Sequence, residues 1–386
     1  MKMCGGFWAG CALVVLMGFA PILSKASTVE SGGGKDAVFY PPLPNPPRVQ
    51  YLVTFSGEND FAKEKSSFTK FIVGDEEVAA PSLQQPYGVA GYKGKIFVAD
   101  TKGPNLAIFD VAQKKFSLFG GVGAGTIAKP IAVVIDADGT RYVSDTKRNQ
   151  IFVYDSTDRF LATFGVEEQF KPVGLAISGD KLYVVDILHH EVQVLDKKTG
   201  RLLFKFSQSG SDPGSLFNPT NIAIGPDGDV YISETGNFRI QRFSADGKPK
   251  RTYGAVGTGL GSFARPKGVA VDKQGRILVV DSAFTNVQVF SNDGALMLFF
   301  GGQSAADTFH MPTGIAIDYE SVPFFQSYAH PKFQMEYLVF VVSQYGPNKV
   351  DVFAVGRMSD MEYPPDKIPS ETPPISPASP PTKPAS

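Results

Sequence analysis

The sequence predicts an all-β fold, a six-bladed β-propeller in which an N-terminal strand completes the last blade. The first observation behind this prediction is a repeat whose units open with a proline and recur every 42 to 47 residues, at Pro86, Pro130, Pro172, Pro219, Pro266 and Pro312. A period in the forties with several strands per unit is typical of propeller blades. The second observation is composition: 40 Gly and 29 Pro among 386 residues, with few helix-length amphipathic stretches, indicate a turn-rich β protein.

Each unit consists of short apolar strands separated by polar turns. The clearest unit, residues 218–243, reads NPTNIAIGPDGDVYISETGNFRIQRF: a proline, an apolar strand, a Pro-Asp-Gly turn, a second strand that ends at Glu234, and a third strand. The run after each proline is small and apolar on both faces, as an innermost strand crowded by its neighbours requires. Turns such as 137–139 and 273–275 supply the glycine that a tight hairpin needs.

The sixth unit lacks the fourth strand that ends most of the others. After Val352 and Phe353 the chain soon enters a proline-rich tail. Residues 50–57, QYLVTFSG, match the fourth strand FLATFG at 160–165, so we expect them to close the last blade. Closure by strands from both ends of the repeat region removes the open sheet edge that would invite aggregation.

The N-terminal segment reads as a signal for export. Residues 1–26 begin with Lys2, continue with an apolar run and end in the small-x-small sequence SKA, which predicts a signal peptide cleaved after Ala26. An uncleaved inner-membrane anchor over residues 3–23 is the main alternative, and lipidation at Cys11 is a third. Both cysteines, Cys4 and Cys11, lie in this segment, so a cleaved chain would contain no thiol. The expected location is periplasmic or secreted, or the inner membrane if the segment is retained.

The remaining chain divides into three parts. Residues 27–48 form a Gly/Pro-rich linker that we expect not to pair as strands, 49–357 the propeller, and 358–386 a disordered Pro-rich tail. The net charge of −1 is unfavourable for nucleic-acid binding, which depends largely on neutralised phosphates. We therefore expect no nucleic-acid partner, and a membrane contact only through an uncleaved N-terminal segment.

The residues SETGNFRIQRF at 233–243 combine an acid, an asparagine three residues on, and an Arg-Ile pair. In this pattern, and in the Gly-rich linkers at 209–219 and 257–266, the chain resembles the NHL repeat family. The resemblance covers roughly residues 50–355 and implies a six-bladed propeller, as in bacterial exported proteins with NHL repeats. The same ring serves binding scaffolds, RNA readers and lyases, so the resemblance implies a fold more than an activity.

A carboxylate ends the second strand in five of the six units: Asp100, Asp145, Asp186, Glu234 and Asp281. Such a ring could hold a cation at the channel mouth. Because each acid recurs at the same strand end, we favour a structural role in which the carboxylate accepts hydrogen bonds from turn N–H groups.

Amidating-lyase relatives of this fold resemble the chain in architecture and hold zinc through histidines from several blades. The four histidines here are His189, His190, His310 and His330, of which the first three could share one face. We expect partly buried or solvated histidines, and we assign no cofactor, metal ligand or catalytic residue. The candidate residues on the channel-face loops are Lys147, Arg148, His189, His190 and Arg239.

The sixth unit carries an aromatic insertion at 319–336 between its first and second strands. The candidate partner-binding residues in it are Tyr319, Phe324, Phe325, Tyr328 and Phe333. The insertion either folds back over the propeller floor or presents an apolar patch to a partner, and the sequence leaves both open.

These observations favour an exported propeller that acts as a protein- or ligand-binding scaffold, with an envelope protein or complex of unknown identity as its partner. The alternative is a propeller enzyme, a lyase or lactone hydrolase, with a metal in the central channel.

Overall fold

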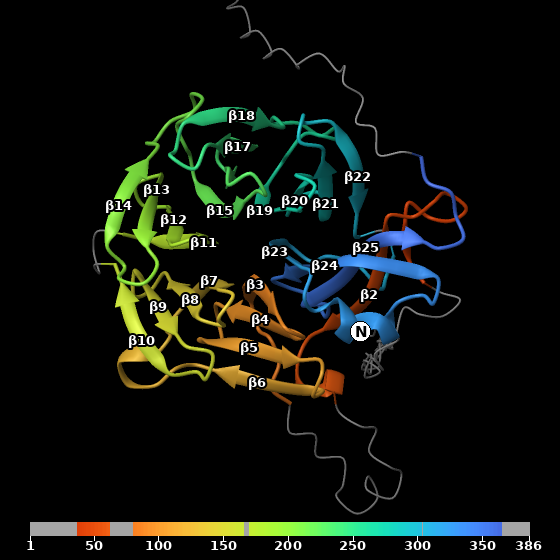
Figure 1. Cartoon of the computed structure of the whole chain (residues 1–386), viewed down its shortest axis with the longest axis horizontal. Helices are drawn as coiled ribbons and strands as arrows, with labels where there is room; N and C mark the ends of the chain where they lie inside the picture. Colours follow the sequence, from red (N-terminus) through yellow and green to blue (C-terminus); the bar gives the residue numbers. More distant parts are fainter. Residues whose placement is uncertain (1–36, 62–79, 166–169, 303, 365–386) are drawn as a thin grey trace, which may run out of the picture.

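The structure is a computed structural model that describes residues 37–61, 80–165, 170–302 and 304–364. Six antiparallel sheets stand around a central channel (Figure 1). The predicted six-bladed propeller is confirmed, and each of the six repeat prolines begins an innermost strand. The predicted signal peptide or anchor at 1–26 lies outside the described residues. Within them, no helix has the length and apolarity needed to cross a membrane.

The blades are numbered in chain order, and in blades one to five the strands run outward from the channel. Blade one contains β3 (Pro86–Tyr92), β4 (Lys95–Asp100), β5 (Asn105–Asp110) and β6 (Lys115–Phe119), and blade two contains β7 (Pro130–Ile135), β8 (Arg141–Asp145), β9 (Gln150–Tyr154) and β10 (Phe160–Phe164). Blade three contains β11 (Pro172–Ser178), β12 (Lys181–Asp186), β13 (Glu191–Asp196) and β14 (Leu202–Phe206). Blade four contains β15 (Pro219–Ile224), β16 (Val230–Glu234), β17 (Arg239–Phe243) and β18 (Pro249–Tyr253), and blade five contains β19 (Pro266–Val271), β20 (Ile277–Asp281), β21 (Asn286–Phe290) and β22 (Leu296–Phe300).

The apolar core is divided into six clusters, each shared by two neighbouring blades. Successive residues of one innermost strand therefore belong to different clusters. Val269 of β19 packs with blade four, whereas Ala270 packs with blade six. This arrangement explains why the run after each proline is apolar on both faces, since both faces of the strand are buried.

The sixth blade contains five strands and joins the two ends of the repeat region. Its order from the channel is β23 (Pro312–Asp318), β24 (Phe333–Ser343), β25 (Val350–Met358), β2 (Val49–Phe55) and β1 (Phe39–Tyr40). The pairing of Phe55 with Val350 and of Val49 with Val355 confirms the predicted closure by an N-terminal strand. Leu52 and Phe55 of β2 are fully buried in the cluster between blades six and one.

Part of the region expected to be an unpaired linker forms the additional strand β1. Phe39 pairs with Gln50 and Tyr40 with Val49, so the expectation that residues 27–48 cannot pair as strands is wrong for these two positions. Both rings are buried, and Tyr40 contacts the ring of Phe300 in blade five at 6.1 Å between centroids. This apolar anchorage outweighs the weak strand tendency of the surrounding prolines.

The expected boundary of the tail at residue 358 also needs adjustment. Met358 ends β25 and is buried, and the ordered chain continues to Tyr363. The Tyr363 ring lies under the Arg48 guanidinium at 4.6 Å, and its hydroxyl donates to the Pro47 carbonyl at 2.7 Å. Residues 365–386 of the predicted tail lie outside the described residues.

A buried carboxylate distinguishes the third strand of blade six from those of blades four and five. At the corresponding position, Gln241 accepts a hydrogen bond from the Gly214 N–H at 2.9 Å and donates to the Ser215 carbonyl at 2.7 Å. Gln288 holds the next linker in the same way. In blade six the position is Asp351, which is fully buried.

Neither carboxylate oxygen of Asp351 has a hydrogen-bond partner among the described residues. The nearby Thr54 hydroxyl donates instead to the Val350 carbonyl at 3.2 Å. Burial raises the pKa of Asp351 well above its usual range, and the Asp307 carboxylate raises it further. Burial raises the pKa of Tyr51, and the negative charge of Asp351, once it is ionised, raises it further. The neutral acid is therefore the form that the folded protein favours.

The first prediction tests ring closure. Removing residues 1–80, so that the chain starts at Pro81, exposes the edge of β25 and removes Leu52 and Phe55 from their cluster. Losing these two side chains costs about 5–10 kcal/mol, comparable to the stability of a whole domain at about 5–15 kcal/mol. The shortened chain should be insoluble or lack a cooperative melt, while a matched chain that starts at residue 37 should melt like the full protein. Equal melting temperatures for the two would contradict the closure.

The second prediction concerns pH. Between the ordinary pKa of aspartate, about 3.9, and the raised pKa of folded Asp351, the folded state holds a proton that the unfolded chain has released. The free energy of unfolding should therefore fall as the pH rises through this window. Asp351→Asn and Asp351→Gln should both lessen that fall, measured by urea unfolding from pH 4 to pH 8. Asp307 also has a pKa raised by burial and leaves a residual slope.

The exposed Asp138 provides the control for this experiment, since Asp138→Asn should keep the slope of the native chain. Asp351 variants whose stability falls with pH as steeply as that of the native protein would show that this carboxyl is not the titrating group.

Candidate functional site

The five strand-ending carboxylates, Asp100, Asp145, Asp186, Glu234 and Asp281, are at most 1% exposed. Asp145 shows what they do: one oxygen accepts from the backbone N–H groups of Ala128 (2.6 Å) and Lys129 (2.8 Å), in the incoming linker. The other accepts from those of Lys147 (2.9 Å) and Arg148 (3.0 Å), in the following turn. Asp100 and Asp281 bind linker and turn in the same way. The predicted structural role is confirmed.

Glu234 and Arg239 form a variant of this arrangement. The Arg239 guanidinium lies 2.7 Å from Glu234 Oε1 and donates to the carbonyls of Ser211 (2.7 Å) and Ser215 (3.0 Å). The Arg239 side chain is 13% exposed. It therefore fixes the linker before blade four and has little freedom to contact a ligand.

Besides His189, the exposed members of the candidate set are Lys147 and Arg148. Only their backbone N–H groups are engaged, by Asp145, and no ion pair of either side chain is found in the described part of the chain. His190, in contrast, packs against the Phe217 ring at 5.2 Å, and its Nδ1 lies 3.3 Å from the Ser209 hydroxyl. The side chains of Lys147 and Arg148 are thus exposed to solvent, whereas the side chain of His190 contacts the rest of the fold.

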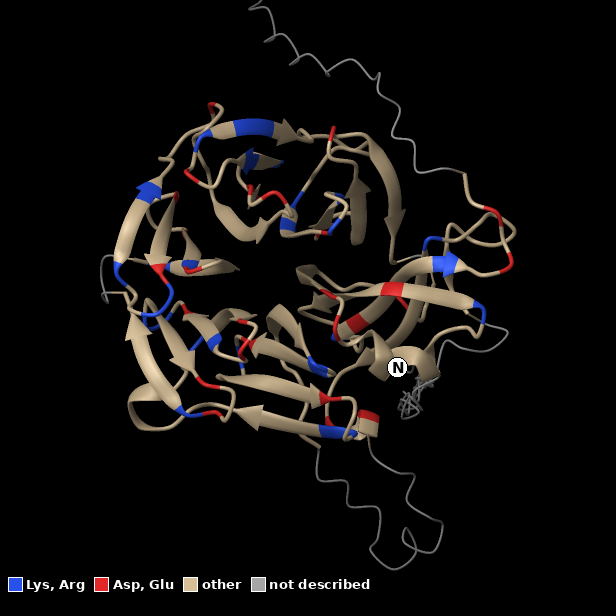
Figure 2. Ribbon diagram, in the orientation of Figure 1, with Lys and Arg blue, Asp and Glu red and all other residues tan. Residues whose placement is uncertain are grey.

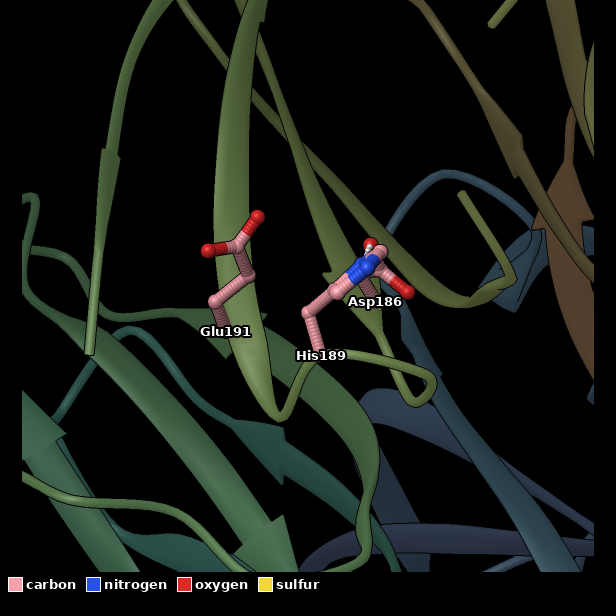
Figure 3. Close-up of side chains that lie close together, drawn as sticks. All are labelled: Asp186, His189 and Glu191. Carbon is pink, nitrogen blue, oxygen red and sulfur yellow. Dashed lines mark hydrogen bonds and ion pairs between the residues drawn. The ribbon is translucent and has the colours of Figure 1, made fainter. Parts of the chain in front are cut away.

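His189 lies with Asp186 and Glu191 at the turn between β12 and β13 (Figure 3). His189 Nδ1 is 2.7 Å from Asp186 Oδ2, and the three possible ligand atoms lie within 4.8 Å of one another. Ligands of a tetrahedral zinc ion lie about 3.4 Å apart. Glu191 is already paired with Lys205 at 3.0 Å. The group is a hydrogen-bonded network that stiffens the turn.

The central channel has a volume of about 310 Å³ and is lined by the innermost strands of all six blades. Its lining consists of Gly, Ala, Val, Leu and Ile together with Asn221, whose amide oxygen accepts from the Ile222 N–H at 2.7 Å. No lining residue carries an ionisable side chain. Zinc and calcium need histidine, thiolate or carboxylate ligands, so these residues do not fit a metal centre in the channel.

The channel opens between the interblade linkers and the turns that the carboxylates fix. Seven basic residues lie in these segments or beside them: Lys102, Lys129, Lys147, Arg148, Lys171, Arg265 and Lys267. In the same segments, within the described ranges, Glu58 and Asp212 are the exposed acids. The backbone hydrogen bonds therefore hold the buried carboxylates in place, while the exposed charged residues of these segments are mostly basic. Around the ring as a whole, acidic and basic segments are interleaved (Figure 2).

The aromatic insertion of blade six folds onto the protein. Its 3-10 helix η3 (Val322–Tyr328) places Phe325 in the cluster between blades six and one, with its ring 6.1 Å from Phe340 and 6.5 Å from Phe55. Phe333 is also buried. Burial leaves both rings unable to contact a partner.

The other three candidates in the insertion keep some exposure. Tyr319 stacks on Tyr337 at 5.0 Å and accepts from the Lys273 N–H at 2.9 Å, and Tyr328 packs on Phe325 at 5.8 Å. Phe324 is 40% exposed and rests on the turn at Gly94, which donates its N–H to the Ser321 hydroxyl at 2.8 Å. The insertion thus seals the ring closure, and Phe324 offers its most exposed ring.

The geometry defines a six-bladed β-propeller with an apolar channel and a basic mouth. The model of the NHL repeat matches residues 218–243 and 263–290, which contain the first three strands of blades four and five. The chain is therefore a propeller that carries NHL repeats in blades four and five.

Curated relatives share only part of the sequence. The chain is 30% identical over 144 residues to peptidylglycine alpha-amidating monooxygenase of Rattus norvegicus, which covers 36% of this chain and 13% of that protein. It is 33% identical over 98 residues to Protein brain tumor of Drosophila melanogaster, covering 24% and 9%. The chain thus spans about a tenth of the length of these two relatives.

A solved structure resembles nearly the whole propeller. A gluconolactonase from Xanthomonas campestris superposes with a TM-score of 0.54 and 17% identity, over 83% of this chain and 97% of that one. At this level of identity the similarity shows the fold alone.

The third prediction compares the two neighbouring phenylalanines of the insertion. Phe325→Ser should lower the free energy of unfolding by about 3–5 kcal/mol, because it removes a fully buried ring. Phe324→Ser should change it by less than about 1 kcal/mol, because that ring is largely at the surface. Urea unfolding of the full chain measures both. Similar losses in the two variants would show that Phe324 also supports the fold.

Proposed function

We propose that this protein is a binding module of the cell envelope, and that it engages its partner through the face formed by the interblade linkers and the carboxylate-fixed turns. The observation that carries the proposal is the division of charge on this face. The five strand-ending acids are buried and hydrogen-bonded, while Lys147 and Arg148 are exposed without an ion-pair partner in the described residues. Binding residues held on a rigid scaffold are commonly found in such loops.

Export supports the envelope location, and it rests on the pattern of residues 1–26. A positively charged start, an apolar run and a small-x-small end are typical of a secretory signal. A retained segment would place the same face at the inner membrane. In either case the partner we propose is an envelope protein or complex.

The alternative function is a propeller lyase or lactone hydrolase, which the similarity to a gluconolactonase fold brings into consideration. The lining of the channel does not supply the ligands for a catalytic metal. The group of Asp186, His189 and Glu191 lies at a turn and is engaged by Lys205 and backbone N–H groups. These contacts favour the binding function.

The fourth prediction tests the binding face by charge reversal. Cross-linking in intact cells should join the native protein to a discrete envelope protein. Lys147→Glu with Arg148→Glu should remove most of this product, because it reverses two exposed charges on the proposed face. The matched control is Lys114→Glu with Lys115→Glu, two exposed cations at the β5–β6 turn. Loss in both variants, or in neither, would contradict the proposed face.

The metal content of the purified protein separates the two functions independently. The binding function predicts less than about 0.1 zinc or calcium ion per chain after dialysis. A stoichiometric ion that is lost in His189→Ala would favour the enzyme.

A further inference from the structure

The residues that precede the six repeat prolines form a ring around the channel mouth: Gln85, Lys129, Lys171, Asn218, Arg265 and Met311. The backbone of this ring is fixed, because Lys129, Lys171 and Arg265 donate their N–H groups to the carboxylates of their own blades at 2.8 to 3.0 Å. Their side chains are exposed. The repeat thus anchors three cations around one opening.

A fourth cation, Lys267, lies just inside this ring. It follows Pro266 at the start of β19 and is half-buried. Burial and the charge of Arg265 both lower the pKa of its amine. No carboxylate pairs with Lys267 or Arg265 in the described residues, whereas Arg276 in the same blade is paired with Asp272. Two neighbouring cations, one of them partly desolvated, are therefore uncompensated.

Tyr87 adds a hydrogen-bond donor from the other side of blade six. It occupies in blade one the position that Lys267 occupies in blade five, directly after the repeat proline. Burial raises the pKa of Tyr87 to about 12, against the opposing effect of the Arg265 charge. Its backbone is held by the Thr313 hydroxyl, which donates to the Tyr87 carbonyl at 3.1 Å. Tyr87 therefore stands at the start of β3, at the same channel mouth as Arg265.

From this juxtaposition we propose that the channel mouth binds a small carboxylate- or phosphate-bearing anion, held by Arg265, Lys267 and the Tyr87 hydroxyl. A guanidinium, an ammonium and a hydroxyl supply the charge-assisted donors that such groups require. The apolar channel of about 310 Å³ below them would accept a short hydrocarbon portion of the ligand. The proposal rests on the proposed function, because it assigns a ligand class to the same face.

The fifth prediction is tested by calorimetric titration of the full chain at low ionic strength with inorganic phosphate and, separately, with succinate. At least one should bind saturably, and the two titrations distinguish a phosphate from a carboxylate site. Arg265→Gln with Lys267→Gln should weaken binding at least tenfold. The matched control, Lys114→Gln with Lys115→Gln at the β5–β6 turn, should change it less than twofold. Binding should weaken in salt and as the pH rises toward the lowered pKa of Lys267.

A second variant distinguishes a loss of binding from a loss of folding. Tyr87→Phe keeps the ring and its packing, and should weaken binding about threefold to tenfold without changing the melting temperature. The proposal fails if neither probe binds to the native protein, or if the Arg265 and Lys267 variant binds as tightly as the control. The cross-linking result depends on Lys147 and Arg148 instead, so the anion site and the binding face can fail separately.

Discussion

The structure depends on one buried carboxylate at the end of each second strand in blades one to five. In its full form the carboxylate accepts two N–H groups from the incoming linker and two from the following turn, as Asp281 does with Ala264, Arg265, Ala283 and Phe284. A hydrogen bond to a charged group contributes about 1.5–3 kcal/mol. The acid therefore joins the linker that enters the blade to the turn after the second strand, and it fixes where the proline of the same blade begins the innermost strand.

Blade six lacks this carboxylate and is held by other contacts. Ser343 stands at the strand end, where its hydroxyl accepts the His310 N–H at 3.2 Å. Lys349 bridges the Gln344 carbonyl and the Gln84 carbonyl in the linker to blade one, at 3.0 and 3.1 Å. The closing strand β2 and the insertion around Phe325 add the apolar burial. Blade six is thus stabilised by apolar packing, whereas a buried carboxylate stabilises each of blades one to five.

The period of the prolines was sufficient to predict the fold, because each blade repeats one local pattern of strand and turn. It also predicted β2, since residues 50–57 carry the pattern of a fourth strand. It failed for β1, where Phe39 and Tyr40 are ordered by distant partners such as Phe300 and Phe353. Hydrophobicity alone shows that a segment will be buried but not against what, and the insertion was ambiguous for the same reason.

The site was predicted less completely than the fold. The structural role of the strand-ending acids was predicted correctly, because a residue type that recurs at the same position in five blades is expected to serve the fold of each blade. Lys267 and Tyr87 were missed, although both stand directly after a repeat proline, where a comparison of the six units would have singled them out. Asp351 could have been found in the same way, opposite Gln241 and Gln288. A position-by-position comparison of the six units would have shown these three residues as departures from the repeat.

The repeat separates the groups that support the ring from those that are free to bind. Each carboxylate is buried and hydrogen-bonded to N–H groups in the linker or the turn of its own blade, so it fixes the mouth without being exposed there. The side chains next to those N–H groups, such as Lys129, Lys171 and Arg265, are not needed for closure, because Gln85 occupies the same place in blade one with the same backbone contact. Their charge is therefore free to vary without cost to the fold. The architecture therefore does not require the concentration of cations at this mouth, and this is the basis of the proposed anion site.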